Sequence, residues 1–376
     1  MSHNINTETS MKASGKKILI LANNSTGLYN FRKDLIESLI NCGYEVAAST
    51  PANGMLDELT ALGCRLIRTD FQRRSVGPLN ELKLFNKYKK IIKDEMPDIV
   101  ITYTIKPNIY GGMACQKCGV EYACNITGLG TVFERGGYLK KIAIGLYKRA
   151  LKNARVVFFE NASNRDMFVQ LGIIKEEKTH VLHGAGVNLS KFEIKPYPYN
   201  ELFRFLFVGR VMVEKGVREL LSALSKLRED GYNCCLDLVG SNQEDMSVEM
   251  EKLIDAGCLF AHGYQRDVRP FIENCDCFVL PSYHEGMANT NLECAASGRP
   301  IITSDIPGCR EAVVENVSGL LCQPRNARDL YEKMKVMIEK SRSERETMGK
   351  EGRKHMERTF DKKAVVKDTI DALRIV

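Results

Sequence analysis

Apolar residues along this 376-residue chain gather in short dense runs, and the longer segments between them carry apolar residues at helical spacing. The segment FRKDLIESLINCG shows that spacing, which is typical of an amphipathic helix. Short runs rich in β-branched and aromatic residues are typical of strands. In the first half these runs are KILILAN, EVAAST, RLIRTDF, DIVITYT, EYACNIT and RVVFFEN. The alternation predicts βαβ units and a parallel sheet.

At Lys195 the pattern is interrupted by PYPYNELF, a polar stretch with two prolines that predicts a linker. The alternation then resumes, with strands predicted at FRFLFVGR, CCLDLVG, CLFAHG, CFVLPS, PIITSD and GLLC. The chain also exceeds the roughly 250–300 residues that one hydrophobic core serves. We therefore predict two doubly wound α/β domains with a cleft between them, where ligands bind beyond the carboxyl ends of the strands.

The charged stretch from Glu332 to Arg358 is predicted to form a solvated helix. The predicted divisions of the chain are a flexible leader over residues 1–15, a first domain over 16–194, a second domain over 195–358 and a closing amphipathic helix over 359–376. The leader is polar and lacks the apolar core of a signal peptide. No run approaches the roughly 18 apolar residues that a membrane span needs.

Composition points to a cytosolic globular protein. Charged residues make up 27% and hydrophobic residues 44% of the chain, which is ordinary for a folded domain. Most of the thirteen cysteines stand in apolar contexts, so we predict that they are reduced core residues. Cys115 and Cys118 have the spacing of a metal or redox pair, but no second pair completes a zinc site. The net charge of +7 favours an acidic partner without identifying it.

The first candidate chemistry is in VGRVMVEKG, where a strand ends at Gly209 and Arg210, and Lys215 follows. The planar guanidinium of an arginine can hold two phosphate oxygens and a lysine adds a mobile charge, so the pair suits a diphosphate. The alternative is a pair of solvated surface cations near Glu214.

The second candidate site is in HEGMANTNLE, which follows the apolar run CFVLPSY. Thr290 and Glu293 have the spacing of a capping box, which explains Glu293 but not Glu285 or the small residues between them. A helix that begins after small residues offers free amide groups and a favourable dipole to an anion. Both carboxylates could then accept hydrogen bonds from sugar hydroxyls.

Five motifs, VGRVMVEKG, HGYQRDV, HEGMANTNLE with its Glu-x7-Glu spacing, SGRPIITSDIPGCREAV and NVSGLL, together resemble the donor domain of family 4 glycosyltransferases with the GT-B fold. In the first half, STGLYNFRKDL, TIKPNIYGG and NITGLG resemble the branch of that family that builds bacterial surface polysaccharides, such as capsule and lipopolysaccharide, on lipid-diphosphate carriers. The resemblance implies two Rossmann-like domains facing across a cleft, the first binding the acceptor and the second the donor, with helix 359–376 returning toward the first.

The resemblance also implies roles for residues. Arg210, Lys215 and Glu285 would be catalytic, with the two cations on the donor diphosphate and Glu285 on the transferred sugar, while Glu293 would hold the ribose. The implied donor site comprises Gly209, Arg210, Lys215, His262, Gly263, Tyr264, Glu285, Gly286, Met287, Ala288, Asn289, Thr290 and Glu293. The implied acceptor site comprises Asn30, Arg32, Lys106, Asn125, Thr127 and Gly128.

The implied reaction retains the anomeric configuration and needs neither a metal ion nor another cofactor. The sequence also favours a reaction without a metal ion, because it has no Asp-x-Asp pair to carry a divalent ion to a nucleotide diphosphate. Many relatives have a first-domain histidine that faces the reacting sugar, whereas CNITGLGTVF has none. Asn125, Thr127 or the backbone could take its place. The run Gly128–Gly130 lacks the third glycine of a dinucleotide loop and is predicted to be a strand-to-helix turn.

Seven basic residues and no acidic one lie between Arg135 and Arg155, among apolar residues at helical spacing. Such a basic amphipathic helix can lie on an anionic membrane surface, or its apolar stripe can pack on the sheet. A second basic stretch covers residues 71–93. Both suit a lipid-diphosphate acceptor, so we expect a cytoplasmic protein, peripheral on the inner face of the membrane. Nucleic acid is not an expected partner, because no recognised binding module is present.

The sequence thus predicts transfer of a hexose or N-acetylhexosamine from a nucleotide-diphosphate sugar to a lipid-diphosphate-linked saccharide. By resemblance the nucleotide is uridine, although no residue excludes GDP. The alternatives are a nucleotide-sugar epimerase on the same fold, a transferase with a soluble acceptor, and a non-catalytic sugar-nucleotide-binding or membrane-scaffold protein.

Overall fold

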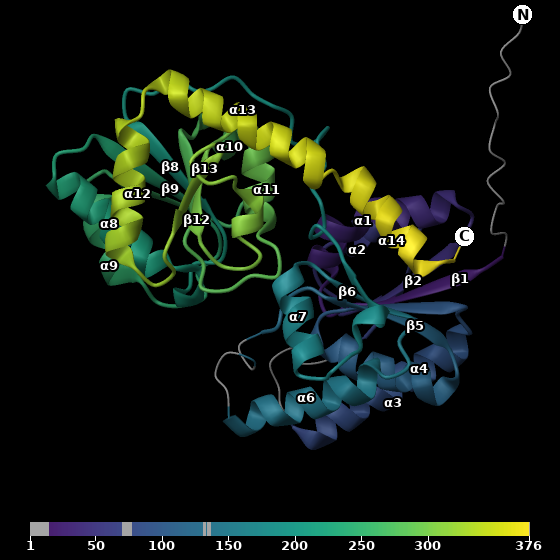
Figure 1. Ribbon diagram of the computed structural model, residues 1–376. Helices are drawn as coiled ribbons and strands as arrows, with labels where there is room; N and C mark the ends of the chain where they lie inside the picture. The colour runs from purple at the N-terminus through teal and green to yellow at the C-terminus, as the bar shows by residue number, and fades with distance from the viewer. Residues whose placement is uncertain (1–14, 70–76, 131–132, 134–136, 376) are drawn as a thin grey trace, which may run out of the picture. The chain divides into compact units, whose positions relative to one another are not determined.

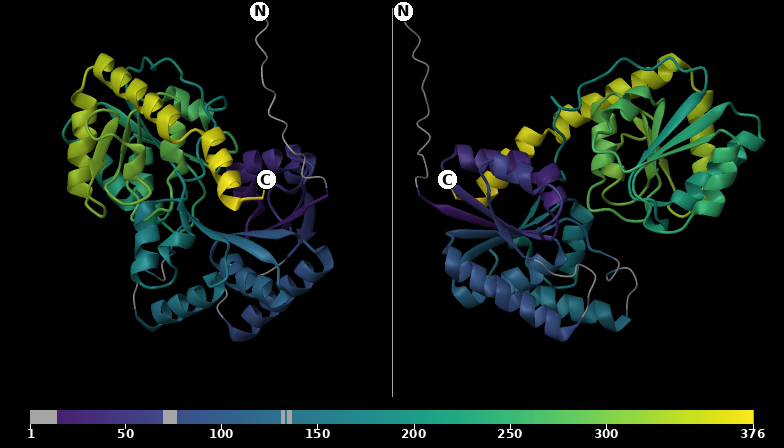
Figure 2. Two further views of the ribbon diagram at one scale, coloured as in Figure 1. Left: turned by 45° about the vertical axis from the view of Figure 1, so that its right-hand side comes forward. Right: turned by 180° about the vertical axis from the view of Figure 1, so that it is seen from behind.

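The computed structural model describes residues 15–69, 77–130, 133 and 137–375, and its described chain divides into two compact units. The first unit takes the described residues up to Phe159, then Arg165–Leu182 and those from Val366. The second takes Glu160–Asn164 and His183–Val365. In each unit, helices lie on both faces of a sheet (Figures 1 and 2). Residues 1–14 of the predicted leader and residues 71–76 of the basic stretch 71–93 lie outside the described residues.

The first unit is built on a seven-stranded parallel sheet in the order β3-β2-β1-β4-β5-β6-β7. Its strands are β1 Lys17–Leu21, β2 Glu45–Thr50, β3 Arg65–Arg68, β4 Ile99–Tyr103, β5 Glu121–Ile126, β6 Val156–Phe159 and β7 Thr179–Val181. Its helical segments are α1 Ser25–Asn41, α2 Leu56–Ala61, α3 Pro78–Glu95, the π-helical turn η1 Pro107–Gly111, α4 Gly112–Cys118, α6 Gly137–Leu151 and, from Arg165, α7 Ala162–Gln170. Six strands were predicted; the short, half-exposed β7 was not.

The second unit is built on a six-stranded parallel sheet in the order β10-β9-β8-β11-β12-β13. Its strands are β8 Phe203–Val208, β9 Cys234–Val239, β10 Leu259–Gly263, β11 Cys277–Leu280, β12 Ile301–Ser304 and β13 Gly319–Cys322. Its helices are α8 Val217–Glu229, α9 Ser247–Asp255, α10 Arg269–Asn274, α11 Asn289–Ala296, α12 Ala327–Glu339, α13 Arg342–Thr359 and the first residues of α14 Lys362–Leu373. The two doubly wound sheets confirm the predicted fold class.

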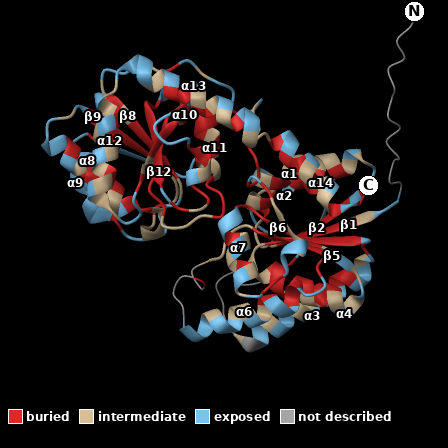
Figure 3. Ribbon diagram, in the orientation of Figure 1, coloured by how far each residue is buried: buried red, intermediate tan, exposed pale blue. Residues whose placement is uncertain are grey.

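The strands of both sheets are largely buried, as runs of apolar residues in parallel sheets require, and the outer faces of the helices are exposed (Figure 3). The chain crosses into the second unit at His183, ahead of the predicted linker at Lys195. Its end is held on the first unit, where Asp368 contacts the His180 ring nitrogen at 2.9 Å and the Tyr44 hydroxyl donates to the Ile375 carbonyl.

The predicted single solvated helix over 332–358 is wrong. Helix α12 ends at Glu339 with Lys340 as its C-cap, and a capping box of Ser341 and Glu344 starts a second helix, α13. One face of α13 is buried and includes Gly349. The helix packs so closely here that a Cβ on Gly349 would lie 2.0 Å from the Gly298 carbonyl oxygen. Glycine at this position lets two backbones approach closely, which a charge count along the helix does not reveal.

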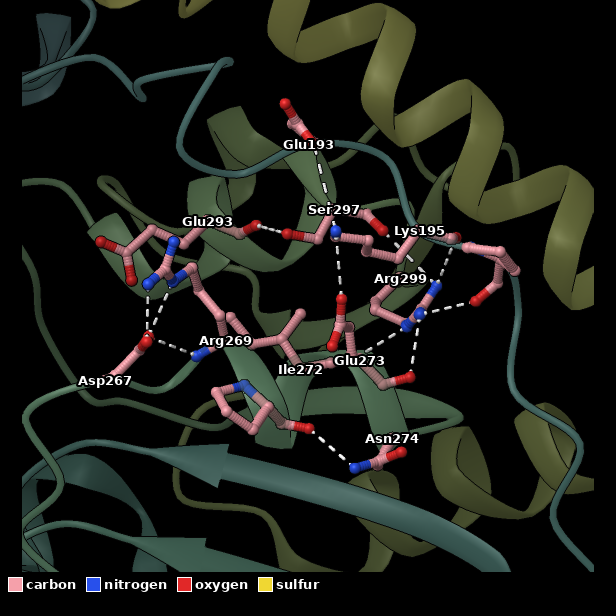
Figure 4. A network of polar contacts seen from close by, with 12 residues as sticks. Glu193, Lys195, Asp267, Arg269, Ile272, Glu273, Asn274, Glu293, Ser297 and Arg299 are labelled. Atoms are coloured by element: carbon pink, nitrogen blue, oxygen red, sulfur yellow. Dashed lines mark hydrogen bonds and ion pairs between the residues drawn. The ribbon is translucent and has the colours of Figure 1, made fainter.

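The start of the predicted linker is tied into the second unit by Arg299, whose side chain is fully buried (Figure 4). The guanidinium donates to the carbonyl oxygens of Lys195 at 3.2 Å and Pro196 at 2.9 Å. It also donates to those of Ile272 at 2.8 Å and Glu273 at 3.0 Å in α10. One side chain therefore joins the linker, α10 and the start of β12.

Candidate active site in the second unit

The loops that follow β8, β9 and β10 are joined through their backbones at the carboxyl edge of the sheet. The Gly209 amide donates to the Val239 carbonyl at 2.9 Å, and the Gly240 amide donates to the Gly263 carbonyl at 2.8 Å. Gly240 has a φ of 153°, and a Cβ there would lie 1.7 Å from the Gly209 carbonyl oxygen. A side chain at Gly240 would therefore push these loops apart.

Arg210 and Lys215 differ in environment. The Arg210 side chain is exposed and makes no hydrogen bond or ion pair with the residues that the structure describes. Lys215 ends a short 3-10 turn, and Gly216, with a φ of 70°, then starts α8. A Cβ on Gly216 would lie 2.0 Å from the Pro281 carbonyl oxygen, so this glycine brings the lysine loop onto the loop after β11.

Lys215 forms an ion pair with Glu285 rather than with its sequence neighbour Glu214. Both partners are largely buried, with 18% of the Lys215 and 13% of the Glu285 side chain exposed. The Ser282 hydroxyl donates to the same Glu285 oxygen at 2.8 Å. Two residues 70 positions apart in sequence, predicted separately, thus lie in contact at the carboxyl ends of β8 and β11.

The helix that follows Glu285 begins with free amides. The N-cap of α11 is Ala288, which cannot cap through a side chain, so the capping box considered for Thr290 and Glu293 does not form. The Ala288 amide donates to the Gly308 carbonyl at 2.7 Å. Four further amides, within the described part of the chain, donate to no protein acceptor: those of Gly286, Met287, Asn289 and Thr290. Free amides at a helix start, together with the helix dipole, favour the binding of an anion.

The first turn of α11 is anchored to the sheet by Asn291, which is fully buried. Its side-chain amide donates to the Thr303 hydroxyl of β12 at 3.0 Å. That hydroxyl donates in turn to the Leu280 carbonyl of β11 at 2.8 Å. The free amides are therefore carried by a helix whose start is fixed against two adjacent strands of the sheet.

Glu293 lies one turn into α11 and is half-buried. Its carboxylate makes no hydrogen bond or ion pair with the described residues. In Figure 4 Glu293 is joined to the network through its main-chain carbonyl, which accepts from the Ser297 hydroxyl at 3.0 Å. Burial raises the pKa of Glu293 from 4.5 to about 7, an effect that the charges of Lys191 and Lys362 partly oppose. A partly desolvated carboxylate without a partner is costly to the fold and is typical of a ligand-binding group.

This environment predicts a pH-dependent gain of stability in Glu293→Gln. The folded protein binds the Glu293 proton more tightly than the unfolded chain, so ionisation makes the wild type lose stability as pH rises from 4.5 to about 7. Glutamine avoids that loss, and we expect the variant to be more stable by roughly 2 kcal/mol at pH 8 and by much less at pH 5. Thermal unfolding at the two pH values measures the difference.

The control for this prediction is Glu251→Gln, at an exposed position on α9. It should change stability by less than about 0.5 kcal/mol at either pH. An equal change in Glu293→Gln at pH 5 and pH 8, or a loss of stability at pH 8, would contradict the account of Glu293.

The implied base-binding segment ends β10. The His262 ring nitrogen contacts Asp237 of β9 at 2.7 Å, and Asp237 also accepts from Arg204 of β8 at 2.6 Å. The His262 side chain is thus engaged with the sheet, while the Gly263 backbone joins the neighbouring loop and the Tyr264 ring is exposed. The roles implied for these three residues stay predictions.

The implied acceptor residues belong to the first unit. Arg32 is buried and its guanidinium stacks on the Tyr103 ring at 4.9 Å, whereas Asn30 is exposed. Lys106 forms an ion pair with Glu81 at 2.9 Å.

Asn125, at the end of β5, is also buried, and its carbonyl accepts from the Asn108 side chain at 2.8 Å. Thr127 and Gly128 follow it in the loop after β5. Arg32 and Asn125 are buried and contact neighbouring residues, so both also contribute to the packing of the first unit. All the acceptor assignments stay predictions.

All thirteen cysteines are free, and eleven of them are buried. Cys115 and Cys118 are both unpaired. Among the described residues, no group of three or more His, Cys, Asp or Glu side chains is arranged to hold a metal ion. Nor does any helix in the described ranges combine the length and apolar character needed to cross a membrane.

Two family descriptions match the chain: "Glycosyl transferases group 1" over residues 191–355 and "Glycosyl transferase 4-like" over residues 17–161. An N,N'-diacetylbacillosaminyl-diphospho-undecaprenol alpha-1,3-N-acetylgalactosaminyltransferase of Campylobacter jejuni is 30% identical, over 86% of this chain and 89% of that protein. The chain belongs to the family 4 glycosyltransferases. The capsular polysaccharide biosynthesis glycosyltransferase CapM of Staphylococcus aureus is 25% identical to this glycosyltransferase, over 78% of this chain and 80% of CapM.

Solved structures agree on the fold. Anabaena HepE, crystallised with UDP and glucose, superposes on the glycosyltransferase with a TM-score of 0.78 at 18% identity, covering 96% of this chain and 100% of HepE. At that identity the likeness shows the GT-B fold and no more.

The sequence did not predict Ser282 or Asn161 as site residues. Ser282 bonds Glu285, and the Asn161 side chain donates to the Gly286 carbonyl at 2.6 Å. Asn161 is 125 positions from Gly286, so no local spacing signals the contact.

Proposed function

We propose that the glycosyltransferase moves a hexose or N-acetylhexosamine, with retention of configuration and without a metal ion, from a UDP-sugar to a lipid-diphosphate-linked saccharide. The observation that carries the proposal is the cluster of free amides at residues 286, 287, 289 and 290 beside the Lys215–Glu285 pair. Arg210, exposed at the same edge, supplies a second cation for the diphosphate. Glu293 accepts from the ribose hydroxyls.

In this account Lys215 and Glu285 exchange partners when the donor binds. The lysine turns from the carboxylate to the diphosphate, and Glu285 then accepts hydrogen bonds from the sugar hydroxyls. During transfer the bond from the anomeric carbon to the phosphate oxygen breaks and its electron pair goes to the diphosphate. The acceptor oxygen bonds the same face of that carbon, and its proton passes to the departing phosphate. Lys215, Arg210 and the amides stabilise the charge that develops.

The lipid-diphosphate acceptor is supported by the Campylobacter relative, whose name states such an acceptor, and by the basic surface of the first unit. The direct test incubates the purified protein with UDP-sugars and a short-chain polyprenyl-diphosphate saccharide, in EDTA, and identifies the product by mass spectrometry and anomeric couplings. An α-linked product from an α-linked donor supports the proposal, and an inverted product contradicts it.

Two controls in the same assay separate the alternatives. Turnover of the donor alone would indicate an epimerase, and equal transfer to the free saccharide would indicate a soluble acceptor. Binding of the nucleotide with no transfer to either acceptor would indicate a non-catalytic protein.

We also infer that the glycosyltransferase works in the cytoplasm at an anionic membrane surface. In α6, Tyr138, Leu139 and Ile142 are 78%, 62% and 41% exposed, while Tyr147 and Ala150 are buried. The second half of the helix thus packs on the unit, and its first half presents apolar side chains among lysines. Arg135 of the predicted stretch 135–155 lies outside the described residues.

Helix α3 extends this surface. It lies beside α6, both helices packing against η1, and it exposes Leu79 and Leu82 (Figures 1 and 2). The same helix carries lysines at positions 83, 87, 89, 90 and 93. Apolar residues that enter the headgroup region and cations that attract anionic lipid are the two parts of an interfacial surface.

The triple variant Tyr138→Ser, Leu139→Ser, Ile142→Ser should bind vesicles containing anionic lipid at least about tenfold more weakly than the wild type, because it removes the side chains that would enter the bilayer. Vesicle co-sedimentation measures this. Val336→Ser, at a position 41% exposed on α12, serves as the control and should bind as the wild type does. Unchanged binding of the triple variant would contradict this membrane surface.

A further inference from the structure

We propose that Asn161 is a positioning residue of the donor loop, defined as residues 284–290, and that it orients the Gly286–Met287 peptide so that the Met287 amide meets the donor diphosphate. The inference rests on the proposed function, because it assigns the loop to a nucleotide diphosphate. Asn161 follows β6 in the chain and belongs to the second compact unit.

Both ends of the Asn161 amide are bonded. Its nitrogen donates to the Gly286 carbonyl at 2.6 Å, and its oxygen accepts from the Asn164 amide at 2.8 Å in the first turn of α7. The side chain is 2% exposed. Because the oxygen caps a helix, the nitrogen is held on the donor loop, and the amide cannot flip without losing both bonds.

The contact fixes a peptide plane. All peptide bonds in the described chain are trans, so the Met287 N–H points away from the Gly286 carbonyl and therefore away from Asn161. That N–H has no acceptor among the described residues. Asn161 thus turns the donor loop so that its carbonyl faces the protein and its amide faces outward, the polarity that an anion needs.

The surrounding backbone allows little other adjustment. Gly308 bonds the Ala288 amide from one side, and a Cβ on Gly308 would lie 2.6 Å from the Gly286 carbonyl oxygen. Gly184, with a φ of 60°, packs on the Met287 side chain, where a Cβ would come within 2.4 Å. The loop is therefore held on its two flanks, and Asn161 supplies the side-chain hydrogen bond that sets the peptide between them.

Asn161→Asp tests the donation alone. Aspartate caps a helix as well as asparagine does, so the bond to Asn164 survives, but a carboxylate cannot donate to the Gly286 carbonyl and repels it. Asn161→Ser keeps a cap without adding charge and is too short to reach Gly286. The matched control is Asn326→Asp: Asn326 caps α12 through its oxygen at 3.0 Å from the Asp329 amide, and its nitrogen donates to Gln323 at 2.9 Å.

Two readouts are taken. Hydrogen–deuterium exchange of the peptide covering 284–290, without nucleotide, should be faster in both Asn161 variants and unchanged in Asn326→Asp. Calorimetry should show UDP binding weakened about tenfold, which corresponds to about 1.4 kcal/mol, and UMP binding weakened by less than about threefold. A residue with a merely structural role would weaken both nucleotides equally.

Each other outcome overturns the proposal in a distinguishable way. Unchanged exchange in the Asn161 variants would show that the contact does not order the loop. Faster exchange with unchanged UDP affinity, or with equal losses for UDP and UMP, would show that the loop is ordered for another purpose. If the wild type binds no nucleotide, the proposed function and the donor role of Asn161 both fail, while the exchange still reports whether the contact exists.

Discussion

Lys215→Ala should lower kcat for sugar transfer about 10²–10³-fold, by analogy with the loss of one oxyanion donor. The lysine lies at the junction of the β8 and β11 loops, and in the proposed reaction its ammonium group neutralises the departing diphosphate. In the absence of donor it forms an ion pair with Glu285, so the alanine variant also leaves that carboxylate without its cation. Steady-state kinetics with saturating donor and acceptor measures the effect.

Two variants sharpen this prediction. Lys215→Arg keeps the charge and should recover part of the lost rate, although a guanidinium does not match the point charge of an ammonium. Lys226→Ala removes an exposed lysine that pairs with Asp230 on the surface and should transfer at the wild-type rate. A Lys215→Ala enzyme within about threefold of the wild-type kcat would remove this lysine from the reaction.

Arg299→Met should lower the free energy of unfolding by about 3–5 kcal/mol, because it removes a fully buried guanidinium that donates hydrogen bonds to several carbonyl groups at once. Methionine is close to arginine in length but cannot donate, so the carbonyls of Ile272 and Glu273 in α10 lose their bonds to the guanidinium (Figure 4). Those of Lys195 and Pro196 lose theirs as well, which frees the linker.

Denaturant unfolding checks this value, with Arg269→Met as the control. Arg269 is half exposed, and within the described part of the chain its side chain bonds only its neighbour Asp267, so its loss should cost less than about 0.5 kcal/mol. A change below about 1 kcal/mol in Arg299→Met would mean that the guanidinium does not hold the linker. Arg299→Lys should lose less stability than Arg299→Met and more than Arg269→Met, because an ammonium cannot reach the carbonyls of the linker and of α10 together.

The sequence was sufficient for the fold because parallel strands buried on both faces leave strong apolar runs. The strands β1, β4, β8 and β9 are such runs. The strand β7 was missed because it is three residues long and only half-buried. The break between α12 and α13 was missed because both helices are highly charged, and the buried face of α13 depends on Gly349 and scattered methionines rather than on a continuous apolar stripe.

The candidate site was predictable where its residues lie within one local motif. Glu285 and the residues up to Glu293 lie on one loop and the helix that follows it, so their spacing in the sequence predicts that they lie close together. The environment of Glu293 was only partly predictable, because the capping box that its sequence permits depends on where α11 begins, and α11 begins with Ala288 as its cap. Asn161 could not be found from spacing, since the contact to Gly286 depends on the fold.

Calorimetric binding of UDP and GDP to the purified protein, in EDTA and in added magnesium, tests directly whether the second unit holds a metal-free diphosphate site. We expect UDP to bind with the same affinity in EDTA and in magnesium, and we expect this binding to be lost in the double variant Arg210→Ala, Glu293→Ala. UDP binding that required magnesium, or no binding of either nucleotide, would contradict a metal-free diphosphate site at the carboxyl edge of the second sheet.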